Sequence, residues 1–348
     1  MAVITSAGTG NSNTGGTWTG GSVPTASDDV QIQSGHTITL NTTHTWNSLD
    51  LQSGGTLDGD GNLLTIDGED GGGYAVDLDG AISGTDTDIT ITIAAATNVD
   101  LVPSSGTIRN LTINHASAVV NIRSAATTIS GNLTITAGTL DTANSGSNLD
   151  LTVTGDVSVT GTLTGNASAI SMGSLTIASG GTYSATSGTT TLTGKNSSNY
   201  MLQNSGTFTH NKGTVKFEAD TSSGTWYATN ATNVEADSIK FYNLETVRTG
   251  SAGSYRFFVG GNSFYLVVLN NLTIGVNTNI HSSNGTSILR HYGPLFNIEG
   301  QASFDNVTDV QCGLITIGSA GVLEFDNGDQ AISCTGIRNL RGSAGIQA

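Results

Sequence analysis

Basic residues are scarce in this chain, and its first third has none. The sequence holds 11 Lys and Arg against 27 Asp and Glu, a formal net charge of −16, and no Lys or Arg precedes Arg109. That stretch contains 13 Asp and Glu, whereas the remainder carries 14 acids and 11 bases. Because a phosphate backbone is bound by a basic surface, the sequence predicts no nucleic-acid partner. The acidic third suits a cation or a basic protein surface, or serves only to keep the chain in solution.

Long apolar runs, helical periodicity and an export signal are also missing. No stretch approaches 18 consecutive apolar residues, so the sequence predicts no membrane insertion. The first residues lack a basic segment followed by an apolar one, which predicts synthesis in the cytoplasm without a secretory signal. No apolar face recurs at 3.6-residue spacing, and this excludes long amphipathic helices.

The sequence instead consists of short predicted strands separated by polar turns. Leu, Ile, Val and Thr alternate at period two between turns rich in Gly, Asn and Ser. One phrase recurs about every 18 to 24 residues, as Asn62-Leu-Leu-Thr-Ile66, Asn110-Leu-Thr-Ile113, Asn132-Leu-Thr-Ile135, Ser174-Leu-Thr-Ile177, Asn271-Leu-Thr-Ile274 and Leu314-Ile-Thr-Ile317. This period predicts an all-β fold, a right-handed parallel β-helix (β-solenoid) with coils of about 18–24 residues. A series of antiparallel sandwiches is the alternative.

The chain is expected to have three regions. Residues 1–55 form an N-terminal cap and the first coils, residues 56–195 a regular β-solenoid shaft, and residues 196–348 an aromatic-richer C-terminal solenoid region. Only 3 of the 20 aromatic residues precede Tyr183. The later aromatics either fill a wider core or form an exposed patch for a partner or a glycan. The candidate contact residues are Trp226, Tyr227, Tyr255, Phe257 and Phe258.

The most distinctive segment runs from Gly16 to Leu40. It combines Trp18-Thr-Gly-Gly-Ser-Val-Pro24 with Asp28-Asp-Val-Gln-Ile32. Residues 14–66 resemble the opening of G8-type and related β-helix proteins, which occur in phage virions (tail fibre, tailspike or appendage) and among bacterial surface adhesins. The resemblance implies a β-helix with a capped first coil, and it leaves the function open.

Resemblance and missing export signal together favour a non-catalytic structural component of a phage virion: a tail fibre, appendage or capsid-associated decoration. Such a protein would act as a rigid β-helical shaft in assembly or host attachment, and by analogy it is expected to be a trimer. Its expected partners are copies of itself, other virion proteins and a host-surface glycan. A tailspike-like glycan depolymerase and an extracellular adhesin that binds carbohydrate are the alternatives.

Acidic turns are the best candidates for a metal site. Asp58, Asp60 and Asn62, with Glu69, match oxygen positions of an EF-hand loop, but Leu63 stands where that loop needs glycine. A true EF-hand is therefore not expected. The sequence calls for no cofactor, and calcium is the one ion that its acidic turns suit, through Asp58, Asp60, Asp67, Glu69 and Asp70.

A depolymerase would need two carboxylates about 5 to 9.5 Å apart in a groove. Glu218 with Asp220, and Glu235 with Asp237, have the spacing of one strand face, but their flanks are ordinary turn sequence. We therefore predict no catalytic residue.

Cys312 and Cys334 are 22 residues apart, about one predicted coil. Stacking on neighbouring coils would bring them within reach of a disulfide. Two reduced thiols that serve as small apolar residues are the other interpretation.

Overall fold

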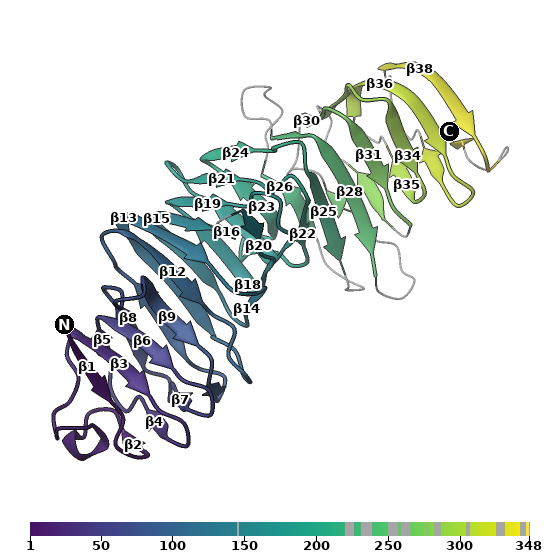
Figure 1. Cartoon of the computed structure of the whole chain (residues 1–348). Coiled ribbons are helices and arrows are strands. Elements are labelled where there is room, and N and C mark those ends of the chain that lie inside the picture. Colours follow the sequence, from purple (N-terminus) through teal and green to yellow (C-terminus); the bar gives the residue numbers. More distant parts are fainter. Residues whose placement is uncertain are drawn as a thin grey trace. The chain divides into compact units, whose positions relative to one another are not determined.

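A computed structural model describes residues 1–144, 146–219, 226–230, 239–249, 257–258, 265–276, 278–281, 287–303, 307–324, 331–341 and 346–347. Nearly all of their regular structure is parallel β-strand, stacked coil upon coil (Figure 1). The exceptions are one 3-10 turn, η1 (Gly15–Thr17), and the antiparallel pair β16 (Ala143–Asn144) and β17 (Ser147–Asn148). The predicted β-solenoid is confirmed, and the antiparallel sandwiches are excluded.

The chain divides into two compact units, Met1–Ile170 with Gly180–Tyr183 and Ser171–Ser179 with Ser184–Ala348. Each coil of the first unit contributes strands to three faces. The first face stacks β1 (Ala2–Thr5), β3 (Asp28–Ile32), β6 (Ser48–Leu51), β9 (Tyr74–Leu78), β12 (Ala96–Asp100), the later parts of β13 (Asn110–Ile122) and β15 (Leu133–Asp141), and β19 (Thr162–Thr164). The second face holds β2 (Gly10–Asn11), β4 (Thr37–Thr39), β7 (Thr56–Asp58) and β10 (Ala81–Ser83), then β14 (Thr127–Ile129) and the start of β18 (Leu151–Val159). The third face holds β5 (His44–Trp46), β8 (Leu63–Ile66), β11 (Asp88–Ile91), the starts of β13 and β15, and the end of β18.

The second unit repeats this arrangement. One set of paired strands is β22 (Thr189–Leu192), β25 (Thr214–Ala219), β28 (Asn243–Arg248), β31 (Asn271–Ile274), β34 (Leu295–Ile298) and the ends of β36 (Val307–Ile317) and β38 (Ala331–Asn339). Another is the end of β20 (Ile170–Ile177), β23 (Tyr200–Asn204), β26 (Trp226–Thr229), β29 (Phe257–Phe258), β32 (Asn279–His281), β35 (Gln301–Ser303), β37 (Val322–Glu324) and β39 (Ile346–Gln347). The third is β27 (Lys240–Phe241), β30 (Tyr265–Val268), β33 (Ser287–His291) and the starts of β36 and β38. Two further strands, β21 (Thr182–Ser184) and β24 (Thr207–Thr209), pair with each other.

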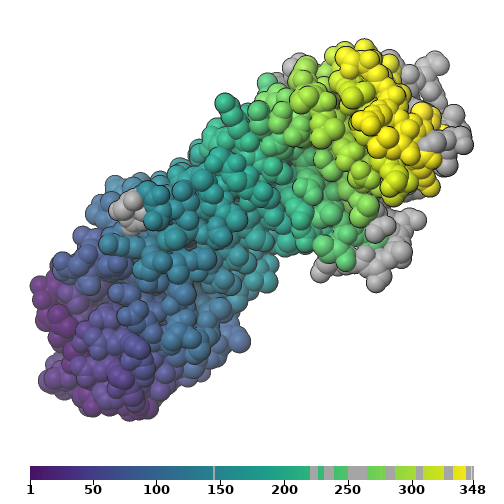
Figure 2. Space-filling view, turned by 45° about the vertical axis from the view of Figure 1, so that its right-hand side comes forward, coloured from purple at the N-terminus to yellow at the C-terminus, as the bar shows by residue number. Residues whose placement is uncertain are grey.

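The recurring phrase places the core. Leu111 pairs in register with Leu133, and Ile113 with Ile135, so that the inward side chains of successive coils form columns. All four are at most 1% exposed, because period-two alternation turns every second residue inward. On the surface of the first unit, the colours that mark chain order form successive bands, as stacked coils require (Figure 2).

Trp18 is buried within the first coils of the stack. The ring of Trp18 is 1% exposed and packs edge-on against Trp46, with ring centroids 5.9 Å apart. Its indole Nε1 donates to the carbonyl oxygen of Ser12 at 2.8 Å. Among the described residues, no helix is long and apolar enough to cross a membrane.

Candidate functional site

A row of carboxylates crosses the first face of the first unit. Asp50 of β6 pairs in register with Asp77 of β9, and Asp77 pairs with Asp100 at the end of β12. Adjacent strands lie about 4.8 Å apart, so one carboxylate follows another along the stack. Gln31 of β3 precedes them in the same register, and its Nε2 donates to Asp50 Oδ2 at 2.8 Å.

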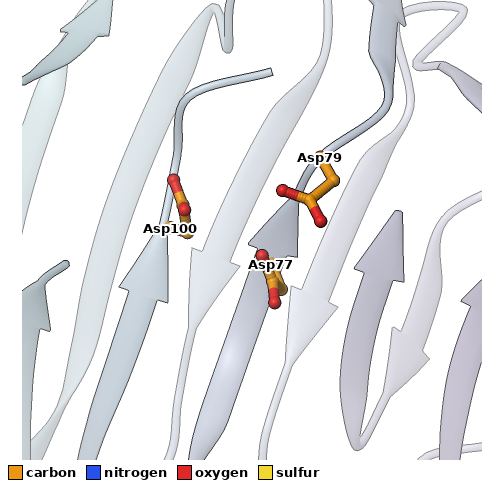
Figure 3. A group of neighbouring side chains, drawn as sticks. All are labelled: Asp77, Asp79 and Asp100. Carbon is orange, nitrogen blue, oxygen red and sulfur yellow. The ribbon is translucent and has the colours of Figure 1, made fainter. Parts of the chain in front are cut away.

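Two of these acids, Asp77 and Asp100, form a compact group with Asp79, and we call this group the acidic triad. Each offers a carboxylate oxygen within 4.8 Å of the others. Asp77 and Asp79 come from β9 and the residue after its end, and Asp100 from the neighbouring strand (Figure 3). Within the described part of the chain, no Lys or Arg forms an ion pair with the triad.

The close approach of these charges changes the pKa of Asp77. Burial raises the pKa of Asp77 to about 6, and the surrounding carboxylates add to the effect: Asp79, Asp100, Asp50 and Asp70. Like charges at this separation favour the neutral form of one member. A proton on Asp77, or a cation bound between the carboxylates, would relieve this repulsion. Carboxylate oxygens suit a hard ion such as calcium, with water as the remaining ligands.

A pocket of about 160 Å³ lies beside this row. It is lined by Val3, Asp29, Val30, Gln31, Ser48, Asp50, Asp70 and Gly71. Asp29 Oδ1 accepts hydrogen bonds from Asn47 Nδ2 at 2.6 Å and from Ser48 Oγ at 2.8 Å. Asp70 Oδ1 accepts from the backbone amides of Gly72 and Tyr74, both at 2.8 Å. These bonds fix both carboxylates at the rim, so the pocket presents negative charge in a set orientation.

The five acids named as metal ligands from sequence fall into two groups. Asp58 is the last residue of β7 and Asp60 follows that strand, whereas Asp67, Glu69 and Asp70 follow β8. The strand β8 (Leu63–Ile66) lies between the groups, and four residues of strand span about 13 Å. The structure therefore does not bring the five together. Of these five acids, only Asp70 lies beside the row of carboxylates, where it lines the pocket with Asp50. None of the three triad residues is among the five predicted ligands.

The sequence contains a signal for the row of Asp50, Asp77 and Asp100. The tripeptides Leu49-Asp-Leu51, Val76-Asp-Leu78 and Val99-Asp-Leu101 place an aspartate between two inward apolar residues on one face. Their spacing is irregular because the turns between them differ in length. Coil register, which sequence alone does not supply, is needed to align them.

The predicted aromatic contacts have different locations. Trp226 is 6% exposed and belongs to the core, whereas Tyr227 is half-buried. Tyr227 pairs in register with Tyr200 on the preceding coil, with ring centroids 5.3 Å apart. Phe257 and Phe258 form the strand β29, where the backbone of Phe258 pairs with Tyr227. Tyr255 lies outside the described residues.

Of the paired acids considered for glycan cleavage, one is described. Glu218 Oε2 forms a salt bridge with Lys216 Nζ at 2.6 Å on the same strand. Asp220, Glu235 and Asp237 lie outside the described residues.

Comparison with known proteins adds no family or relative. No protein-family model matches the chain, and no curated protein or solved structure is significantly similar to it.

Proposed function

We propose that this protein is a non-catalytic structural component of a phage virion, a β-helical shaft that works in assembly or host attachment. The observation that carries the proposal is the in-register stack of coils beneath a built N-terminal cap. Because the inward side chains of each coil pack on those of the next, the columns make the stack of coils rigid. The acidic face and the N-terminal resemblance add to this support.

Coil-to-coil bonding supports the mechanical part of the proposal. Parallel strands bond each coil to the next on three faces. Amide side chains add further bonds between coils: Asn62 Nδ2 donates to Leu40 O at 2.6 Å, and Asn121 Nδ2 to Thr97 O at 3.1 Å. Such links leave few backbone groups unpaired between coils, which favours stiffness within each unit.

The segment that resembles virion β-helix proteins supports the remainder. Residues 14–66 contain the cap and the first complete coils. Trp18 closes the first coil, and Asp28 Oδ2 accepts from the amide and the hydroxyl of Thr25 at 2.9 and 2.8 Å, which fixes the turn after Pro24. A covered first coil prevents indiscriminate strand pairing at that end.

The proposal is tested by the solution mass and shape of the purified chain. Light scattering is expected to give three times the 35.4 kDa of one chain, and negative-stain images of the same sample are expected to show rods. A compact monomer by both measurements would contradict the shaft proposal.

Carbohydrate binding is the second candidate function, and the stacked Tyr200 and Tyr227 rings favour it. A ladder of tyrosines at the surface offers flat apolar faces with hydroxyl groups, which suits a sugar chain. Binding to an array of surface glycans is expected to weaken about fivefold in Tyr227→Ala, since one stacking contact contributes on the order of 1 kcal/mol. Tyr292→Ala, which removes a tyrosine 63% exposed elsewhere, is the matched control. Equal loss in both variants, or release of shortened glycans by the wild type, would contradict binding at this ladder without cleavage.

A further inference from the structure

The two cysteines of the chain lie opposite each other on neighbouring coils. Cys312 of β36 pairs in register with Cys334 of β38, between the pairs Gln311↔Ser333 and Leu314↔Gly336. Paired parallel strands run about 4.8 Å apart, which lies within the 4.4 to 6.8 Å that disulfides span between Cα atoms. Because in-register residues direct their side chains to the same side of a sheet, both thiols face the same way.

The two strands need only a small approach to close the bond. A disulfide needs Cβ atoms about 3.5 to 4.5 Å apart, slightly closer than strands in regular register place them. Among the described residues, β38 pairs with β36 alone, so no other described strand has to follow this movement.

The two thiols differ in exposure. Cys312 is buried, and burial together with the neighbouring Cys334 raises its pKa to about 12. Cys334 is half-buried. A reagent in solution therefore reaches Cys334 first, and Cys312 is placed to react only with a neighbour.

We propose that Cys312 and Cys334 form a redox-sensitive crosslink that fastens the coil of β38 to the coil of β36. The oxidant is a low-molecular-weight disulfide such as oxidised glutathione. The Cys334 thiolate attacks one of its sulfurs and releases one thiol, which leaves a mixed disulfide on Cys334. Cys312 then attacks the Cys334 sulfur and releases the second thiol, its proton being taken up by the leaving thiolate. One small disulfide is reduced to two thiols, and two protein thiols are oxidised to one disulfide.

The crosslink goes beyond the proposed shaft function and does not depend on it. A covalent link between β38 and β36 adds to the backbone hydrogen bonds that already join the two coils. The stability of this part of the solenoid then depends on the redox state of the surroundings. The chain would carry two thiols in a reducing compartment and the closed bond in an oxidising one.

The test uses the purified full chain in oxidised and then in reduced glutathione. Titration of the denatured products is expected to find two free thiols before oxidation and none after it. The intact mass is expected to fall by about 2 Da, the two hydrogens lost, and peptide mapping is expected to join Cys312 to Cys334. Reductant should restore the starting state.

Two single variants separate the roles of the thiols. Cys312→Ser is expected to gain one glutathione on Cys334, whereas Cys334→Ser should remain unmodified while folded, because Cys312 is buried. In the wild type, tryptic cleavage after the exposed Arg338 is expected to slow about tenfold on oxidation. A folded wild-type chain that keeps two free thiols, stops at the glutathione adduct or links two chains together would overturn the proposal.

Discussion

The side-chain Oδ1 of Asn110 accepts a hydrogen bond from the backbone amide of Asn132, 22 residues later, at 2.8 Å. Asn132 repeats the arrangement with the backbone amide of Asp156, 24 residues on, at the same distance. Each amide side chain thus satisfies a backbone donor of the next coil at the corner before the third face. The asparagine that opens the recurring phrase is therefore a link between coils.

Replacement of Asn132 by Ala is expected to destabilise the chain by about 1 to 2 kcal/mol, since the Asp156 amide loses its acceptor. Urea unfolding followed by circular dichroism measures the change. Asn132→Asp keeps an acceptor oxygen and should lose less. Asn114→Ala, at an exposed asparagine of the preceding coil, is the control, and an equal loss there would contradict a linking role.

The Trp18 cap allows a prediction on the first coil. Trp18→Phe gives up the bond from Nε1 to the Ser12 carbonyl, whereas Trp46 Nε1 is buried with no hydrogen-bond partner. We therefore expect Trp18→Phe to destabilise more than Trp46→Phe, by about 1 kcal/mol. Trp18→Ala should lose about 3 to 5 kcal/mol as a large buried ring is removed. Thermal unfolding of the three variants measures this order, and a costlier Trp46→Phe would contradict it.

The fold was accessible from sequence because the core repeats in phase. The phrases at Asn110 and Asn132 occupy register positions on adjacent coils, and so do the apolar residues of 62–66 and 88–91. The distance along the chain between repeated apolar phrases therefore equals the length of one coil. The β16–β17 hairpin interrupts no apolar column, so the apolar pattern of the sequence did not predict it.

The acidic site was not accessible in this way. The metal site was predicted within residues 58–70 because acids are dense there. In the structure, β8 separates the acids at its start from those at its end. The triad gathers Asp77, Asp79 and Asp100 from two coils, through turns of unequal length. Proximity across coils depends on register, which local composition does not encode.

The triad makes stability depend on pH. The pKa of Asp77 is about 6 in the folded chain against 3.8 for the ordinary group, so the folded state binds its proton more tightly. The resulting stabilisation is complete below pH 3.8 and is lost as the pH rises through 6. Since Asp77 is only half-buried, solvent screening limits the effect to about 1 kcal/mol. In Asp77→Asn, chemical unfolding should show higher stability at pH 7.5 and a smaller loss between pH 4 and 7.

Asp60→Asn removes one charge at an exposed position outside the triad and is the control. The same pair of variants tests a cation. Calcium at ten times its dissociation constant would raise the stability of the wild type by about 1.4 kcal/mol, and chelation would reverse this. Asp77→Asn should lose the response and Asp60→Asn should keep it. A calcium response of equal size in both variants would place the ion elsewhere.

Close contact between coils predicts where glycine is required. A Cβ added at Gly161 would lie 2.4 Å from the carbonyl oxygen of Gly138 on the preceding coil, and 2.9 Å from Cγ2 of Ile135. Neither neighbour can withdraw easily, because the Gly161 amide donates to Ile135 O at 2.9 Å and its carbonyl accepts from Thr182 N at 2.8 Å. Gly161→Ala is therefore expected to destabilise by about 1 to 3 kcal/mol.

Gly16, where a Cβ would meet nothing within 4 Å, is the matched position. There the change to Ala should be neutral or stabilise by up to about 1 kcal/mol, since it restricts the unfolded chain. Urea unfolding of both variants measures the difference, and equal effects would contradict a contact this close between the coils.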